Sequence, residues 1–173
     1  MADPIIPDDP FADLVRAIGM FVISFNELEV ALGGVLMHLL NQDEETGTVF
    51  VSHLSAGVKI TLLQGLTFKI ADAGLKKEFS ELLKQAAEAN IERNRFIHSE
   101  YWVDSDTSSN AKPMTLYRKL RDAHHPTAFP VTIKELSKYI RAVNADEVTE
   151  WANDTAILAM DLLEFAEKHR PGL

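Results

Sequence analysis

The stretch IERNRFIHSEYW, residues 91–102, brings together side chains that are well suited to proton and phosphate chemistry. The imidazole of His98 exchanges a proton near neutral pH, as a general acid or base must. The guanidinium of Arg93 presents a permanent positive charge in a fixed geometry, which suits a phosphate group. Because the stretch also ends a leucine-rich helical segment, it is either the edge of a hydrophobic core or a place where chemistry happens.

The helix that ends in this stretch is predicted over 75–96 and has one apolar face. That face is formed by Leu75, Phe79, Leu82, Leu83 and Ala86. At about 100° per residue, Asn90, Arg93 and Ile97 continue the same face, so we expect Arg93 to be buried. A buried arginine requires a partner. His98 lies about 140° round the helix from Arg93 and is expected to point toward solvent or a partner protein.

The first predicted helix offers a partner for that arginine. Its apolar stripe includes one charged residue on the same face, Glu29. We therefore predict that Glu29 and Arg93 lie close together. Two interpretations stay open: a buried ion pair that only fixes the register of two helices, or a carboxylate that holds Arg93 ready for a ligand or a phosphate.

The apolar periodicity predicts a mainly helical domain. Asp9 and Pro10 mark the start of the first helix as an N-cap and a first-turn proline. A capping box from Thr132 to Glu135 starts the last helical segment, within which Asn144 marks a kink or a break. The predicted helical segments are 10–40, 48–72, 75–96 and the stretch from Thr132 to near the C-terminus. The expected fold class is all-α, a bundle of four or five helices.

Residues 99–131 interrupt the helical pattern with clusters of Asp, Ser, Asn and Pro. Short β-prone pieces occur at 100–104 and 114–120, so we expect an irregular or β-hairpin-like excursion before the C-terminal helices. A length of 173 residues favours a single domain over 1–173, in which residues 1–8 form a flexible N-terminus.

Charge is distributed unevenly along the chain. The formal net charge is −9, which argues against a protein that coats nucleic acid by long-range attraction. Residues 112–141, however, carry seven Lys or Arg against two acidic residues, a local net charge of +5. This segment, which includes Lys119 and Arg121, is either a solvated face or a surface that meets phosphates. We predict that it lines the same groove as His98.

The composition fits a cytoplasmic protein. Cysteine is absent, which excludes disulfides and thiolate metal sites and fits a reducing compartment. The N-terminus is acidic and proline-rich, unlike a secretory signal. The longest apolar run, AIGMFVISF, has nine residues and is too short to span a bilayer, so we expect no membrane association.

Two groups of polar residues partly resemble metal-binding motifs but lack residues that those motifs require. The first comprises Asp104, Asp106 and Asn110, which lack the glycine and the glutamate of a calcium loop. The second comprises His98, Glu100, His124 and His125, without an H-E-x-x-H helix. We therefore expect no metal and no other cofactor.

The run R-N-R-F-I-H, in which four residues separate Arg93 from His98 and the polar Asn94 follows the arginine, resembles the R-x4-6-H motif of the HEPN superfamily. The pattern FNELEVALGGVL, which contains Glu29 in the apolar stripe of the first helix, is similar to that family too. HEPN domains are small helical domains, and many are RNases of toxin–antitoxin and antiviral systems. The likeness covers the first three predicted helical segments.

The resemblance implies a metal-independent endoribonuclease that acts as a homodimer, in a toxin or defence system that can include an antitoxin protein. The ribose 2′-hydroxyl would attack the adjacent phosphate of RNA and leave a cyclic phosphate end. His98 would act as the acid or base, Arg93 would stabilise the transition-state phosphate, and Asn94 would orient the phosphate or His98. Glu29 and Ser99 would support them. The residues expected to bind RNA are Tyr101, Trp102, Lys119 and Arg121.

Two alternatives to this enzyme stay open. One is a HEPN-like helical module that binds RNA, a nucleotide or a protein without cleaving it. The other is a helical interaction protein whose likeness to the family is accidental. In either case Tyr101 and Trp102 would serve the core beside a helix end, where aromatic residues commonly pack.

Overall fold

The computed structural model describes residues 10–98, 100–104, 115–119 and 140–169, and it shows a mostly helical molecule. Its helices are α1 (Pro10–Leu39), α2 (Glu44–Ser52), α3 (Ala56–Leu66), η1 (Thr67–Lys69, a short 3-10 helix), α4 (Ala73–Ile97) and α6 (Ala145–Lys168). Its strands are β1 (Glu100–Asp104), β2 (Thr115–Lys119) and β3 (Ile140–Val143), which pair antiparallel in the order β1-β2-β3. The expected helical fold class is confirmed in this coarse sense, with a small sheet added.

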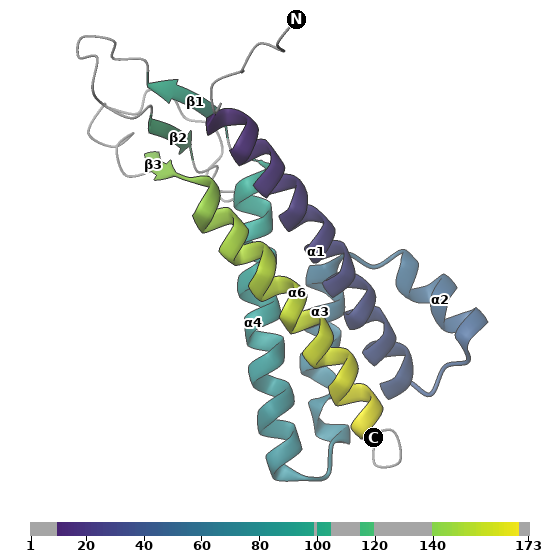
Figure 1. Ribbon diagram of the computed structural model, residues 1–173. Coiled ribbons are helices and arrows are strands. Elements are labelled where there is room, and N and C mark those ends of the chain that lie inside the picture. Colours follow the sequence, from purple (N-terminus) through teal and green to yellow (C-terminus); the bar gives the residue numbers. More distant parts are fainter. Residues whose placement is uncertain (1–9, 99, 105–114, 120–139, 170–173) are drawn as a thin grey trace, which may run out of the picture.

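Figure 1 shows α1, α3, α4 and α6 as an elongated bundle, with α2 at its side and the sheet at one end. The helices α1 and α6 both begin at the sheet end and run in the same direction, whereas α4 runs the opposite way. The C-terminus of α4 therefore lies at the sheet end, where β1 follows it after two residues. This arrangement places the motif residues of α4 beside the sheet.

The core of the bundle is built on α1, which contacts α2, α3, α4 and α6. Its apolar stripe is buried along the helix, and Leu28, Leu32 and Leu36 are completely excluded from solvent. Burial of each such leucine contributes about 1.5–3 kcal/mol, so this stripe is a large part of what holds the bundle together. The stripe has the helical spacing that the sequence predicts for residues 10–40.

The C-terminus of α1 is closed by local and distant hydrogen bonds. Asn41 adopts a left-handed backbone with φ of 52°, and its amide and that of Gln42 donate to carbonyls in the last turn of the helix. This is the Schellman arrangement. The ammonium of Lys69, in η1, donates to the carbonyl oxygen of Leu39 at 2.8 Å. The predicted end of the first helix near Leu40 is thus confirmed.

By length and composition alone, α1 is also apolar enough to cross a membrane. The stretch Ala12–Leu39 is long enough and has a mean hydropathy of 1.5, although the longest uninterrupted apolar run is only nine residues. A core helix of a bundle meets the same criterion. In the structure, the buried stripe of α1 packs within the bundle.

The segment predicted as one helical region over 48–72 contains two helices and a 3-10 turn, so that prediction was wrong in its boundaries. Asp43 starts α2 earlier than expected, because its carboxylate accepts the amide hydrogen of Thr46 at 2.9 Å. This hydrogen bond lowers the pKa of Asp43 below its ordinary value. The turn between α2 and α3 contains neither glycine nor proline, which is why the sequence pattern did not reveal it.

The prediction that a helix continues from Thr132 was wrong at residues 140–143, which form β3. These residues have an apolar spacing that is compatible with a helix, but they pair with β2 and form a strand instead. The β-branched Ile140 and Val143 suit a strand. Asn144 marks a true boundary, since it is the N-cap of α6. Its side-chain oxygen accepts the amide hydrogen of Glu147 at 2.7 Å.

Aromatic contacts fix the bundle at two levels. Phe79 of α4 stacks on Phe165 of α6, with ring centroids 5.0 Å apart. Phe21 of α1 meets Phe96 of α4 edge to face at 5.4 Å, and both rings are buried. Because Phe96 lies in the last turn of α4, the second contact anchors the helix end that carries the motif.

Several expectations fall on residues outside the described part of the chain. They concern the tail 1–8, Ser99, Arg121, the capping box at Thr132, and the candidate metal ligands Asp106, Asn110, His124 and His125. Most of the basic segment 112–141 also lies there, so its predicted position beside His98 stays a prediction.

Candidate functional site

A surface pocket of about 220 Å³ lies where the middle of α1, the start of α3 and the C-terminal half of α4 meet. Its walls are Phe25, Glu29, Ser55, Ala56, Gly57, Asn90, Arg93 and Asn94. Three residues singled out from the sequence, Glu29, Arg93 and Asn94, are thus brought to one place. The pocket is the strongest candidate for a ligand site, because a concave surface with convergent polar groups is what small ligands use.

Arg93 is half-buried at the margin of the core, not in the core as the helical wheel predicted. Its guanidinium donates to the side-chain oxygen of Asn94 at 3.1 Å and lies over the ring of Phe25, 5.7 Å from the centroid. Among the described residues, no carboxylate oxygen lies within 4.0 Å of it. The guanidinium is therefore held by a ring and an amide, and its charge is not neutralised by a direct ion pair.

The buried stripe of α4 turns away from Arg93 in the last turns of the helix. Ala89, Glu92 and Phe96 continue it, whereas Ile97 is 38% exposed. Glu92 is buried and forms an ion pair with Arg95, one turn further along. The helical-wheel prediction failed for two reasons. The direction of the apolar face was derived from residues 75–86 alone, and a polar residue, Glu92, occupies part of the true core face.

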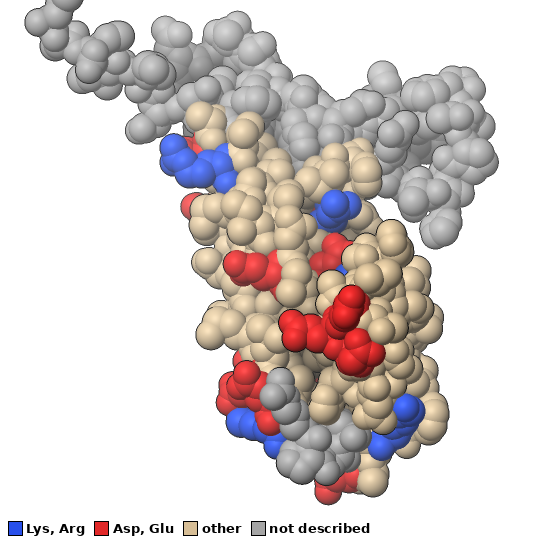
Figure 2. Space-filling model, turned by 90° about the vertical axis from the view of Figure 1, so that its right-hand side faces the viewer, with Lys and Arg blue, Asp and Glu red and all other residues tan. Residues whose placement is uncertain are grey.

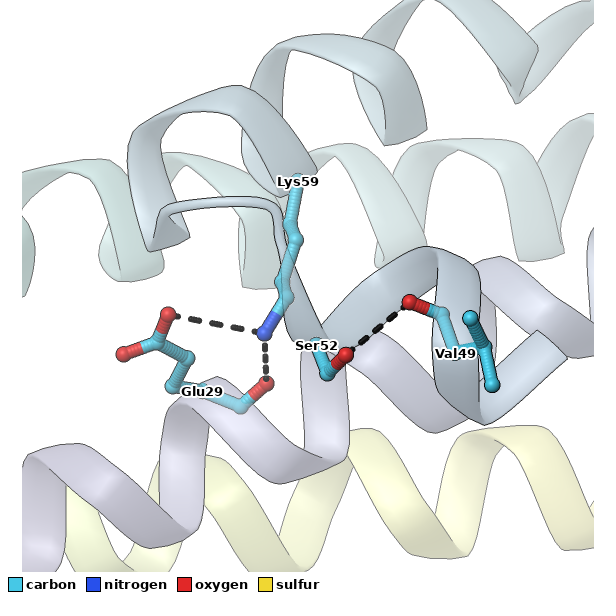
Figure 3. Close-up of polar contacts among 4 residues, drawn as sticks. All are labelled: Glu29, Val49, Ser52 and Lys59. Atoms are coloured by element: carbon cyan, nitrogen blue, oxygen red, sulfur yellow. Dashed lines mark hydrogen bonds and ion pairs between the residues drawn. The ribbon is translucent and has the colours of Figure 1, made fainter.

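Glu29 does not pair with Arg93, so the predicted ion pair was wrong. Its carboxylate lies 3.4 Å from the ammonium of Lys59, which also donates to the backbone carbonyl of Glu29 at 3.2 Å. Figure 3 shows Lys59 extending from α3 to one carboxylate oxygen and to the backbone carbonyl oxygen of Glu29 in α1. Lys59 is 5% exposed, and a buried ammonium needs such acceptors.

Sequence reasoning missed Lys59, although a signal for it exists. Ala56, Lys59, Ile60 and Leu63 are the buried residues of α3. Their spacing of three, four and seven residues is that of a buried helical stripe, so Lys59 is recognisable as a charge on an apolar face once the bounds of α3 are known. The uncertain start of the second helical region concealed it.

The start of α3 forms one wall of the pocket. Ser55 is the N-cap, but its side chain makes no capping hydrogen bond, and Ala56 and Gly57 follow in the first turn. Amide hydrogens in the first turn of a helix have no partner inside the helix and carry partial positive charge. This wall therefore adds to the positive potential that Arg93 supplies.

His98 is the C-cap of α4, and its amide donates to the carbonyl oxygen of Asn94 at 3.1 Å. Its side chain is exposed, as the wheel predicted, and it is not part of the pocket wall. The structure thus places Arg93 and Asn94 in the pocket and His98 one turn beyond it, toward the sheet end of the bundle.

The remaining site residues follow α4 in the chain. Tyr101 and Trp102 lie in β1, where their Cα partners in β2 are Arg118 and Tyr117, and Lys119 pairs with Glu100. For these strands the structure describes the backbone and its register. Their roles in RNA binding therefore stay predictions.

Within the described residues, the charges around the pocket are few. Arg93 and Lys59 are the cations near it and Glu29 is the anion. Figure 2 shows one face of the bundle on which Lys and Arg side chains stand apart and do not form a broad basic surface. The same part of the chain contains no group of three or more His, Asp or Glu that could hold a metal ion.

No protein family model, no curated protein and no solved structure matches this chain. The class of protein is therefore inferred from the geometry of the pocket and from the residues that form it.

Proposed function

We propose that the protein is a metal-independent endoribonuclease of the HEPN type, which binds the phosphodiester of RNA at Arg93 and Asn94. The proposal comes from the spacing of Arg93, Asn94 and His98 at the end of a helix. It is supported by one observation above all: the guanidinium of Arg93 lines a pocket without a direct carboxylate partner in the described part of the chain.

That observation favours a phosphate ligand for a physical reason. A guanidinium that already forms an ion pair must lose it before it binds a phosphate, whereas within the described residues Arg93 is held in place by Phe25 and Asn94 alone. Its fixed plane can then present two parallel N–H groups to phosphate oxygens. The side-chain amide of Asn90, one turn before Arg93 on α4, and the first turn of α3 supply further donors to the pocket.

The proposed reaction is an internal transesterification. The ribose 2′-oxygen forms a bond to phosphorus, the bond from phosphorus to the 5′-oxygen breaks, and the products are a 2′,3′-cyclic phosphate and a 5′-hydroxyl. His98 removes the proton of the 2′-hydroxyl or supplies one to the leaving 5′-oxygen. Arg93 stabilises the additional negative charge on the phosphorane-like transition state, and Asn94 orients the phosphate.

The motif of one chain supplies a single imidazole, that of His98, for the two proton transfers, which is why we propose a homodimer. His98 is exposed at the end of α4, outside the pocket wall, where a second copy can reach it. Two copies that face each other at this end would provide a groove with two histidines and two arginines. Ser99 is proposed as a supporting residue, and Tyr101, Trp102, Lys119 and Arg121 as RNA-binding residues. A cytoplasmic location and an antitoxin partner belong to the same proposal.

The position of His98 also favours a second candidate, a helical module that binds RNA without cleaving it. Because His98 is not among the residues that line the pocket, the pocket of a single chain can hold a phosphate without a catalytic imidazole beside it. The two candidates share the phosphate ligand and differ in whether His98 reaches the scissile bond.

The deciding experiment is cleavage of a labelled structured RNA in EDTA by wild type and by His98→Ala, purified identically. His53→Ala is the matched control, since His53 is another exposed histidine and lies at the end of α2. Cleavage by wild type and the control alone, with cyclic phosphate ends, is the expected result. Binding of RNA without cleavage by any of the three would select the second candidate. Equal cleavage by all three would exclude His98 from the reaction.

A further inference from the structure

Glu29 lies between two cations of different exposure. It lines the same pocket as Arg93, yet its carboxylate is engaged by Lys59. The side chain of Glu29 is 32% exposed, and that of Lys59 is 7% exposed. If the Glu29 carboxylate pairs with Lys59, Arg93 is available to bind another anion. If it pairs with Arg93, it occupies that guanidinium.

Lys59 is built into the interface of α1 and α3. Its ammonium lies 3.4 Å from the Glu29 carboxylate and 3.2 Å from the Glu29 carbonyl oxygen, and Figure 3 shows both contacts. Gly33, one turn further along α1, lies beside this contact and packs closely against Val51. A Cβ at position 33 would lie 3.8 Å from the ammonium and 3.3 Å from Val51.

The burial of Lys59 explains why the Glu29 carboxylate pairs with it and not with Arg93. An ammonium removed from water loses its hydration and must recover that free energy from protein acceptors. Arg93 is half-buried, stays in contact with solvent, and is further stabilised by the ring of Phe25. Transfer of the carboxylate from Lys59 to Arg93 would leave the more buried cation with a single carbonyl acceptor, so the observed pairing is the more stable one.

We infer that Lys59 is a positioning residue that keeps Glu29 from neutralising Arg93, so that the guanidinium is available for a phosphate of RNA. The inference rests on the proposed function, because it assumes that Arg93 binds phosphate. Lys59 is not itself one of the residues that line the pocket, and it acts only through Glu29, which is. A second effect has the same sign, since the ammonium cancels the negative charge that Glu29 brings to the pocket.

The test is binding of a short, fluorescently labelled 2′-O-methyl RNA, which cannot be cleaved by 2′-hydroxyl attack, to the full chain by fluorescence anisotropy. The variants are Glu29→Gln, Lys59→Met, the double variant, and Arg93→Gln. Glu29→Gln is decisive, because glutamine keeps an acceptor oxygen for Lys59 and the variant is expected to fold. Thermal unfolding of each variant, followed by circular dichroism, verifies that it is folded.

Removal of one negative charge near the phosphate should tighten binding by Glu29→Gln roughly fivefold. Lys59→Met should weaken binding roughly tenfold, because the released carboxylate becomes a competitor for Arg93. In the double variant the competitor is gone, so affinity should return to within about twofold of wild type. A purely structural role for the pair predicts that no variant binds more tightly than wild type.

Two outcomes separate the inference from the function on which it rests. Unchanged or weaker binding by Glu29→Gln, together with loss of binding by Arg93→Gln, would overturn the role of Lys59 and leave the phosphate site intact. Wild-type affinity in Arg93→Gln would overturn the phosphate site, and the role of Lys59 with it. If Lys59→Met does not fold, the result for Glu29→Gln still decides.

Discussion

Two regions of the molecule contain the same kinds of charged residues in very different settings. At the pocket, Glu29 and Lys59 join two helices, and Arg93 lines the same pocket with no ion pair to any carboxylate of the described residues. On the outer surface, pairs such as Glu164 and Lys168 lie within one helix and are exposed. An exposed pair exchanges one set of water contacts for another, whereas Lys59 has lost its water and depends on its partner. From the comparison we expect burial, not residue type, to determine how much a charged pair contributes to stability.

The largest expected effect concerns the unpaired arginine of the pocket. Arg93→Gln should lower the rate of RNA cleavage at least about a hundredfold, the usual loss when a donor to the transition state is removed. Arg16→Gln is the matched control, because Arg16 is an exposed arginine paired with Asp13 on the surface of α1. Single-turnover cleavage of labelled RNA measures both. Equal losses in the two variants would mean that Arg93 acts only as surface charge.

The next effect concerns the stability of the two Glu–Lys pairs. Glu29→Ala should lower the free energy of unfolding by about 2 kcal/mol, because it leaves the buried ammonium of Lys59 with one acceptor. Glu164→Ala on the outer surface should have a much smaller effect. Urea denaturation of the two variants and wild type provides the comparison. Similar midpoints for both variants would show that water reaches Lys59.

A polar contact within one helix can still matter when it satisfies the backbone. Asn144→Ala should lower the free energy of unfolding by about 1 kcal/mol, because the amide of Glu147 loses its capping acceptor at the start of α6. Asn144→Ser, which can also cap a helix, should retain most of the stability. Thermal or urea unfolding measures both variants, and equal losses would mean that the cap contributes nothing.

The smallest effect is the pH dependence of the outer pair. The hydrogen bond from Lys168, and then its charge, lower the pKa of Glu164 below its ordinary value. The resulting stabilisation is present above the ordinary pKa of a glutamate and disappears as the pH falls through the lowered value. The small difference in unfolding midpoint between wild type and Glu164→Gln should therefore vanish in acid. A difference that grows in acid would contradict this assignment.

Sequence reasoning succeeded where local physics is sufficient. The span of α1 and most of that of α4 follow from apolar spacing and end signals, and the exposure of His98 follows from its angle on the helix. It failed at residues 140–143, where pairing with β2 makes a strand, because that ladder depends on residues more than twenty positions away in the chain.

At the candidate site, too, some features were predictable from the local sequence and others depended on distant residues. The presence of Arg93 and Asn94 in a polar site was predictable from their types and spacing at a helix end. The partner of Glu29 was not, because two cations compete for its carboxylate and the winner depends on which of them the packing of α3 against α1 buries.

The sequence by itself determined the helical class of this protein, the long core helix α1, and the group of polar residues at the end of α4 that we propose as a phosphate site. Only the tertiary structure decided that α3 places Lys59 over Glu29, and that Arg93 stays at the margin of the core, where no described residue forms an ion pair with it. The reason is physical. Helix formation and apolar faces depend on neighbours three and four residues apart, whereas the free energy of a charge depends on which distant segment removes its water.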